Sequence, residues 1–420
     1  HQRDPAQRHR PAPAGTPPVM PLRSPEQDQF GAAVHALLSR PAPSGRPADG
    51  SEPGADREPG ADVSLRAARR WAAGDRAAGL ALWRDLAGLG VTALAVPESC
   101  GGSGATPLDL VVACEELGHH ALPGPVAESL AAVPRLLTAL PGPAAGEWRP
   151  GPAAGEWRPG PAAGDWLRGL AAGDLIATLA LPPRLPYAVD ADAAGLVLLA
   201  EDDTIWLAAP GPVHRSVDPA RSLFEVRREQ VLASGPEAAG AVRDALRLGA
   251  LASAAQLLGA GRALLEASVR HARVRVQFGQ PVGAFQAVQH RLADVAIGLE
   301  FARPLLDAAA CALADRQPAA ARDVSAAKVA CADAAHRAAR AALQVHGAIG
   351  YTQEHDLSLW LTKVRALIPA WGTQAQHRAE VIAALTAAEQ PGQPGQAARP
   401  GQAAQPGQAA RPGPPEAAWS

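Results

Sequence analysis

The sequence lacks an excess of charge of either sign. Lysine and arginine total 39 in 420 residues, aspartate and glutamate total 41, and the formal net charge is −2. Proteins that follow nucleic-acid phosphates need a basic surface, so we expect no nucleic-acid partner. Long apolar runs are also missing, since no uninterrupted stretch approaches the ~20 residues that span a bilayer, and the amino terminus has no signal-peptide pattern. We therefore expect a soluble, cytoplasmic protein with no membrane partner.

Cysteine is scarce as well. The four cysteines are scattered and form no CxxC pair: Cys100, Cys114, Cys311 and Cys331. This spacing suggests neither a disulfide framework nor a zinc knuckle. We interpret them as buried thiols.

The histidines form no recognisable metal-binding motif. His119 and His120 are adjacent in the sequence, and neighbouring positions on a helix point in different directions, so joint chelation is unfavourable. We interpret the more distant His346, His355 and His377 as surface or core residues. The sequence therefore predicts no metal site.

Glycine and proline, by contrast, are abundant, with 41 residues of each. The prolines cluster in both terminal segments and in a central stretch. Residues 1–24 and 389–420 combine low complexity with little apolar content, which cannot offset the entropy of ordering a chain. We predict that both segments are disordered.

The central stretch contains a nonapeptide repeat. GPAAGEWRP occurs at 142–150 and 151–159, and the variant GPAAGDWLR follows at 160–168. Three copies, two of them broken by two prolines each, are too few to stack into a solenoid with a buried core. We predict an expanded surface linker over residues 141–171.

The rest of the chain predicts a mainly α fold with a small β unit. Residues 25–140 have the 3.6-residue periodicity of helices and form a predicted N-terminal helical domain. Short apolar runs bounded by Pro, Gly and Asp predict a small β domain at 172–232. Residues 233–388 predict an antiparallel four-helix bundle, with helical segments at 237–277, 284–315, 319–346 and 356–388.

Two motifs of the predicted bundle resemble the acyl-CoA dehydrogenase family. They are RVQFGQPVGAFQAVQHRLAD at Arg275 to Asp294 and QVHGAIGYTQEHDL at Gln344 to Leu357. A third stretch, Leu86 to Gly118, is similar to the helical amino-terminal domain of that family, whose domain order is also helical, β and four-helix bundle. The resemblance implies an FAD-dependent oxidoreductase of lipid metabolism that desaturates an acyl-CoA thioester, with FAD lying partly across a subunit interface.

The resemblance also implies a set of FAD-binding residues: Arg275, Gln277, Phe278, Gln286, Gln344, Gly347 and Thr373. Family counterparts of Arg275, Phe278, Gln344 and Gly347 reach the adenine and pyrophosphate end of FAD that is held mainly by the neighbouring subunit. A guanidinium, an amide and an aromatic face suit that task, and glycine allows close approach of a backbone. Taken alone, the same residues also fit ordinary helix ends with an exposed arginine and a buried phenylalanine.

The sequence departs from the family at the catalytic base. Removing a proton from Cα of the thioester requires a poised carboxylate, whose usual place corresponds to Trp371 and whose alternative place corresponds to Gly249. Neither residue is acidic, so we assign no catalytic residue. The family stretch that lies against the flavin ring, expected near Thr178, is replaced by TLALPPRLPYAVDADAAG.

This asymmetry predicts a subunit that completes the FAD site of a partner and has lost its own. The family includes such hetero-oligomers in actinobacterial sterol catabolism, and a homo-oligomer also fits. Three alternatives remain: a stand-alone dehydrogenase with a relocated base, a flavin-dependent monooxygenase on the same fold, and a non-catalytic scaffold. Desaturation by the isolated chain would favour the first, the altered β unit argues against the second, and a yellow protein would exclude the third.

Overall fold

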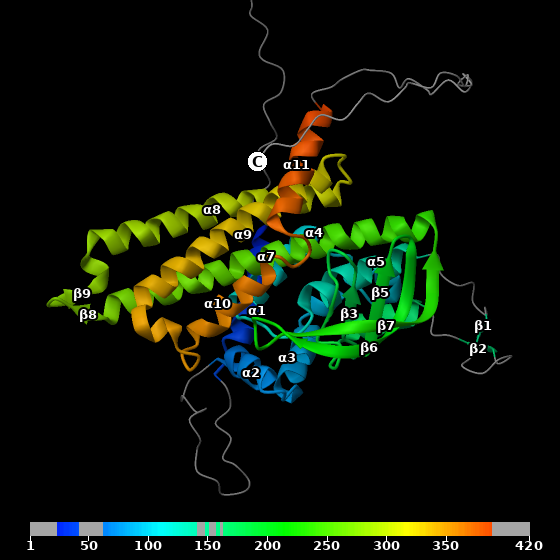
Figure 1. Cartoon of the computed structure of the whole chain (residues 1–420), viewed down its shortest axis with the longest axis horizontal. Coiled ribbons are helices and arrows are strands. Elements are labelled where there is room, and N and C mark those ends of the chain that lie inside the picture. The colour runs from blue at the N-terminus through cyan, green and yellow to red at the C-terminus, as the bar shows by residue number, and fades with distance from the viewer. Residues whose placement is uncertain (1–22, 42–61, 141–147, 151–156, 160–162, 389–420) are drawn as a thin grey trace, which may run out of the picture.

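The computed structural model describes residues 23–41, 62–140, 148–150, 157–159 and 163–388. Within them, a helical amino-terminal layer and a small sheet pack against a bundle of long helices (Figure 1). The mainly α fold class is confirmed. The predicted disorder of residues 1–22 and 389–420 and most of the predicted linker lie outside the described residues.

The amino-terminal layer forms where the sequence supplies helix caps. Ser24 and Gln27 form a capping box at the start of α1, and Thr106 and Asp109 do the same for α4, satisfying backbone N–H groups that a helix start leaves free. The layer comprises α1 (Pro25–Leu38), α2 (Val63–Ala72), α3 (Ala77–Gly88), η1 (Val91–Ala93), η2 (Glu98–Cys100), α4 (Pro107–His119), the short π-helix η3 (Glu128–Ala132) and α5 (Val133–Ala139).

The predicted amino-terminal disorder extends two residues too far. Arg23 donates hydrogen bonds to Glu115 Oε2 at 2.9 Å and to Asp307 Oδ1 at 2.8 Å, and Ser24 caps α1. The partners of Arg23 come from α4 and from the bundle, far along the chain. Local composition therefore could not indicate that these two residues are held in place.

The predicted linker also contains a helix. Residues Ala163–Ala172 form α6, which buries Leu167 and Leu170, and Thr92 Oγ1 donates a hydrogen bond to Ala171 O at 2.8 Å. The third copy of the nonapeptide carries Leu167 and Arg168 where the first two copies have Arg-Pro, so no proline interrupts this helix. Trp148–Pro150 (β1) and Trp157–Pro159 (β2), from the first two copies, pair antiparallel.

The predicted β unit is a five-stranded sheet in the order β3-β5-β6-β7-β4. Only β3 and β5 are parallel, and the other neighbours are antiparallel. The strands are β3 (Ala177–Ala180), β4 (Ala188–Val189), β5 (Leu196–Glu201), β6 (Thr204–Arg215) and β7 (Ser222–Ser234). The last strand thus ends two residues beyond the expected boundary at 232.

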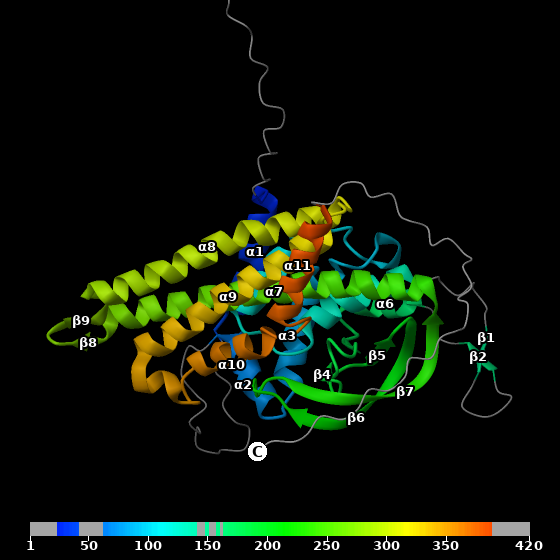
Figure 2. The same ribbon diagram turned by 45° about the horizontal axis from the view of Figure 1, so that its top comes forward.

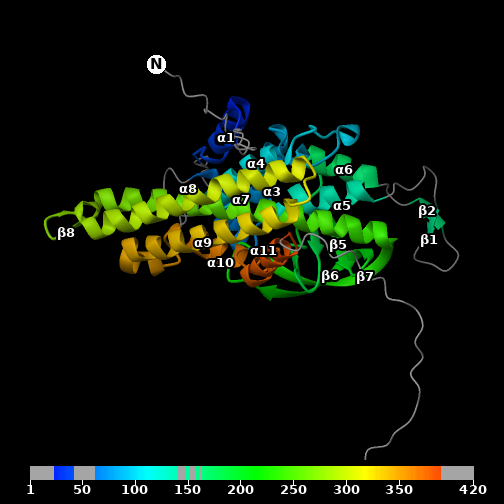
Figure 3. The same ribbon diagram turned by 90° about the horizontal axis from the view of Figure 1, so that it is seen from above.

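The bundle differs from the prediction in its fourth segment. Residues 356–388 form two helices, because the backbone between them turns through Trp371 and Gly372, at φ values of +63° and +111°. The helices α7, α8 and α9 run side by side (Figures 2 and 3). The elements are α7 (Pro236–Val274), β8 (Val276–Gln277), β9 (Gln280–Pro281), η4 (Val282–Ala284), α8 (Gln286–Ala314), α9 (Ala320–His346), η5 (Gly347–Tyr351), α10 (Leu357–Leu367) and α11 (Gln374–Ala388).

Helix α7 runs along the length of the described structure, from the sheet to the β8–β9 hairpin (Figure 1). Its backbone touches that of α4, because a Cβ placed on Gly259 would lie 1.8 Å from Glu115 O. The helix is long and apolar enough to cross a membrane, but 83% of its most apolar window is buried inside the protein. Packing in the protein core accounts for that composition.

Candidate functional site

The two positions at which the family places its base meet in this structure. Trp371 is 1% exposed, and a Cβ placed on Gly249 would lie 2.4 Å from Trp371 Cζ3. The space that a carboxylate on α7 would need is therefore filled by the indole. The two non-acidic residues at the family base positions, Gly249 and Trp371, are therefore in contact. They lie at the junction of the bundle, the sheet and the amino-terminal layer.

The turn that carries Trp371 is anchored by a buried histidine. His377 Nε2 lies 3.1 Å from Trp371 O and its Nδ1 lies 3.0 Å from Ser325 Oγ. Burial lowers the pKa of His377. Because a carbonyl can only accept, the hydrogen bond to Trp371 O is donated by Nε2–H of the ring. This contact fixes the backbone of the turn and, through it, the indole.

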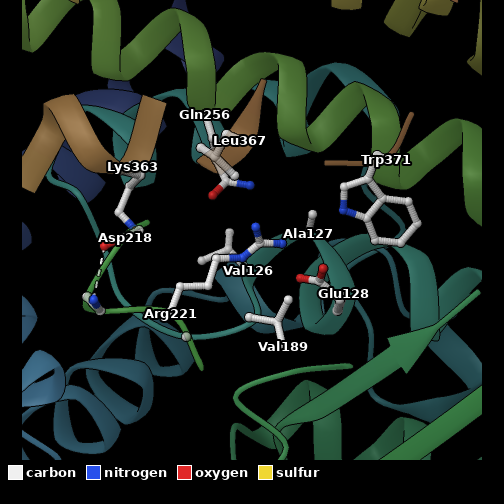
Figure 4. A pocket seen from close by; sticks show the side chains of 12 residues that line it. Val126, Ala127, Glu128, Val189, Asp218, Arg221, Gln256, Lys363, Leu367 and Trp371 are labelled. Atoms are coloured by element: carbon white, nitrogen blue, oxygen red, sulfur yellow. Dashed lines mark hydrogen bonds and ion pairs between the residues drawn. The ribbon is translucent and has the colours of Figure 1, made fainter. Parts of the chain in front are cut away.

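The junction contains a cavity of about 20 Å³, which is room for roughly one water molecule. Figure 4 shows side chains converging on it from every layer. The lining residues are Gly124, Val126, Ala127, Glu128, Val189, Asp218, Ala220, Arg221, Gln256, Lys363, Leu367 and Trp371. A flavin ring or an acyl thioester does not fit into this space.

One carboxyl group that the sequence analysis missed points into the cavity. Glu128 is 3% exposed and is the first residue of the short π-helix η3. Its Oε1 has no hydrogen-bond partner, and the Trp371 indole lines the same cavity. Burial raises the pKa of Glu128, which favours the protonated acid. A single acid within the apolar run PVAESLAAV was the available signal.

A buried ion pair lies at another side of the same cavity. Lys363 Nζ on α10 lies 3.2 Å from Asp218 Oδ2 in the loop between β6 and β7, and both side chains are buried. In the same loop, Arg221 donates to Ala366 O at 3.4 Å. These contacts join the sheet to the bundle and stabilise the closed junction.

The predicted FAD-binding residues at the other end of α7 are exposed. Arg275 caps that helix, and Gln277 precedes a two-residue turn formed by Phe278 and Gly279, at φ values of +53° and +80°. Positive φ at both central positions is typical of a tight hairpin turn. Phe278 is 93% exposed, which differs from the buried phenylalanine of an ordinary helix end.

Residues from the third bundle helix reach the same end. His271 on α7 and His346 on α9 stack with ring centroids 4.3 Å apart, so the turn at Gly347 lies beside the end of α7. Gly347 has φ +64° and open space where a Cβ would be. Gln286 and Gln344 are also exposed here, and a hollow of about 350 Å³ opens beside Val274, His346, His355 and Trp360.

Thr373 lies apart from the other predicted cofactor residues. It caps α11, with Gln376 N donating to Thr373 Oγ1 at 3.2 Å, two residues from Trp371. From Gly249, beside that indole, to Val274, α7 rises by about 37 Å at ~1.5 Å per residue. The predicted residues therefore form two groups, Thr373 beside the middle part of the bundle and the others at the end of α7. One chain cannot bring both groups to the same flavin ring.

Two family models match the chain. "Acyl-CoA dehydrogenase, N-terminal domain" matches residues 61–138, and "Acyl-CoA dehydrogenase, C-terminal domain" matches residues 239–386. The acyl-CoA dehydrogenase IpdE2 of Mycobacterium tuberculosis is 32% identical over 301 residues, which is 71% of this chain and 84% of that protein.

Solved structures show the same fold. Butyryl-CoA dehydrogenase of Megasphaera elsdenii superposes with a TM-score of 0.66 at 19% identity, covering 87% of this chain and 99% of the other. A chain of the ChsE4-ChsE5 complex from Mycobacterium tuberculosis superposes with a TM-score of 0.65 at 21% identity, covering 88% and 99%.

Proposed function

Because this chain belongs to the acyl-CoA dehydrogenase family of FAD-dependent oxidoreductases, we propose that it completes the FAD site of a partner subunit. The observation that carries this proposal is the Trp371 indole against Gly249, which fills the place of the family base. The partner would hold the flavin ring and supply the carboxylate. The substrate of the assembly would be an acyl-CoA thioester.

The exposed end of the bundle fits the adenine and pyrophosphate part of FAD. Arg275 offers a guanidinium, Phe278 a free aromatic face, and Gly347 a backbone with no side chain in the way. A guanidinium binds phosphate oxygens through paired charge-assisted hydrogen bonds. These groups would hold and orient the nucleotide end of the cofactor, and the redox chemistry would belong to its flavin ring.

The interior of this chain does not fit the flavin ring. The cavity between Glu128 and Trp371 measures only about 20 Å³, and the Lys363–Asp218 ion pair joins the layers around it. We therefore assign no proton-transfer step to the residues of this chain in the complex.

Association with another subunit is supported by an apolar stripe on α8. Ile297, Phe301 and Leu305 are exposed and spaced four residues apart, so they lie along one side of the helix. Exposed apolar patches of this kind mark protein interfaces. The solved ChsE4-ChsE5 structure, a complex of two named proteins with this fold, supports a hetero-oligomer.

The test is FAD retention in the complex that co-purifies with this chain from its native source. Arg275→Ala removes a charge-assisted contact worth about 1.5–3 kcal/mol, so we expect FAD affinity to fall roughly ten- to hundred-fold. Arg243→Ala is the matched control, because Arg243 is an exposed arginine near the other end of α7. Equal flavin occupancy in the two variants would overturn the proposal.

Glu128 favours a second candidate, a stand-alone dehydrogenase with a relocated base. Its carboxyl group lines the same cavity as Trp371 at the family base position, and its Oε1 has no hydrogen-bond partner. This function requires Trp371 to move so that substrate can enter. Desaturation of acyl-CoA by the isolated chain, lost in Glu128→Gln, would establish this candidate and exclude the first.

A further inference from the structure

A cluster of three histidines and one glutamate lies between α1 and α4, separate from the flavin-related sites. One donor atom from each of His35, Glu116, His119 and His120 lies within 4.8 Å of the others. The rings of His119 and His120 are 4.8 Å apart, so the expectation that they diverge is wrong. Helix α4 ends at His119, and His120 leaves helical geometry at φ −97° and ψ 11°, which brings the rings together.

The closest donor separations match those of a metal centre. His35 Nδ1 lies 3.0 Å from Glu116 Oε2 and 3.1 Å from His120 Nε2. Ligands at ~2.0–2.1 Å from a tetrahedral Zn²⁺ are about 3.4 Å apart. Closing the widest separation of 4.8 Å to that value takes side-chain movements on the order of 1 Å.

Groups outside the cluster already orient three of the four donors. His119 Nε2 lies 3.0 Å from Glu266 Oε2, Glu116 Oε1 accepts from Arg262 at 2.9 Å, and His120 Nδ1 lies 3.4 Å from Ser64 Oγ. Metal-binding imidazoles commonly use their second nitrogen in this way. His119 Nδ1 is buried without a hydrogen-bond partner, so this nitrogen has an unused lone pair.

The chemistry of the donors favours a transition metal. Three imidazoles and one carboxylate are ligands that Zn²⁺ prefers, and a neutral ring is the form that binds. His35 is 44% exposed at its side chain, which leaves a path for an ion to enter from solvent.

We propose that His35, Glu116, His119 and His120 bind a divalent transition metal, Zn²⁺ by preference, and that the bound ion fastens α1 to α4. Four protein ligands leave no open coordination position, which is typical of a structural site. The ligands come from two helices with most of the amino-terminal layer between them in sequence. Metal binding would therefore stabilise the packing of α1 independently of flavin or acyl-CoA.

The test is Zn²⁺ titration of the untagged full chain after treatment with a chelator. We expect one tightly bound Zn²⁺ per chain and a higher melting temperature with the metal, because a ligand that binds only the folded state stabilises it. His35→Ala should abolish both effects, and the half-exposed position of His35 lets the variant fold. His290→Ala, at an exposed histidine on α8, is the matched control and should behave like the parent.

A second variant tests Glu266, the carboxylate outside the cluster that contacts His119. Glu266→Gln keeps all four ligands but weakens the contact that orients His119, so the affinity for Zn²⁺ should fall about 10–100-fold. Absence of stoichiometric Zn²⁺ binding by the parent chain would overturn the proposal. So would equal affinity in the parent, His35→Ala and Glu266→Gln, since the ion would then be bound elsewhere.

Discussion

Trp371 and Gly249 are complementary residues: the indole lies where any side chain at position 249 would have to be, at 2.4 Å from a Cβ placed there. A carboxylate at position 249 would therefore have to displace the indole. The two departures from the family pattern are thus a single packing arrangement in the protein core.

Gly249→Ala should destabilise the protein. The added methyl group collides with a buried indole, and overpacking a core costs about 1–3 kcal/mol. Gly240→Ala on the same helix meets only the flexible end of Arg243 at 3.8 Å and should leave the free energy of unfolding unchanged or raise it by up to about 1 kcal/mol. Urea unfolding measures both, and equal effects would show that the indole yields freely.

Trp371→Glu should not restore desaturation in the isolated chain. A general base contributes about 10²–10⁴-fold, and only when flavin and thioester are held in reacting geometry. Replacing a buried tryptophan also removes packing worth about 3–5 kcal/mol. The measurement is acyl-CoA oxidation with an artificial electron acceptor, alongside the melting temperature.

Mixing the chain with an acyl-CoA dehydrogenase partner that has its carboxylate is the positive control for that assay. The active complex should contain about one FAD for each pair of unlike chains. Robust turnover by Trp371→Glu alone would contradict the partner-subunit proposal, because it would require an intact flavin pocket in this chain.

Arg23→Ala should cost about 1.5–3 kcal/mol of unfolding free energy, the range for hydrogen bonds to charged groups. Arg23 pairs with the fully buried side chain of Glu115 and with Asp307. Arg40→Ala removes an exposed pair with Asp85, and such pairs contribute about 0–1 kcal/mol. If denaturant unfolding gave the same loss for both, the Arg23 network would contribute no more than a surface ion pair.

Lys328 should give stability a measurable dependence on pH. Burial lowers the pKa of Lys328 to about 7, whereas an unfolded lysine titrates near pH ~10.4. Between these values the unfolded chain binds more protons, so this residue makes stability rise with pH, by up to about 1.4 kcal/mol per unit. In Lys328→Met, unfolding free energies at pH 7, 8 and 9 should lack this rise. Parallel profiles for parent and variant would contradict the shifted pKa.

The helices that the sequence predicted best are those whose ends are encoded locally. Capping boxes at Ser24 and Thr106 fix the starts of α1 and α4. The break between α10 and α11 was missed, because Trp371 adopts a positive φ that its residue type disfavours. Only contacts with distant residues, such as that of His377 with the Trp371 carbonyl, hold the chain in that turn.

Of the candidate sites, the sequence indicated the residues at the end of the bundle but not the histidine cluster. The motif residues Arg275 and Phe278 are exposed at one end of the bundle and Gly347 is partly exposed there, as their places at helix junctions suggest. The histidine cluster was not foreseen, because His35 meets His120 from another helix. Spacing between neighbours cannot indicate which distant helix packs nearby.

Helix α7 carries Gly249 in its first half and Val274 at its end, and this length keeps the two regions far apart. Effects of substitutions more than ~7–10 Å apart usually add without interaction, so selection can act on one region while the other drifts. A chain that needs to present only the hairpin to a partner can let its interior fill with side chains at no cost to that task. Directed evolution on such a scaffold can therefore recruit the filled junction for another use while the hairpin surface is kept unchanged.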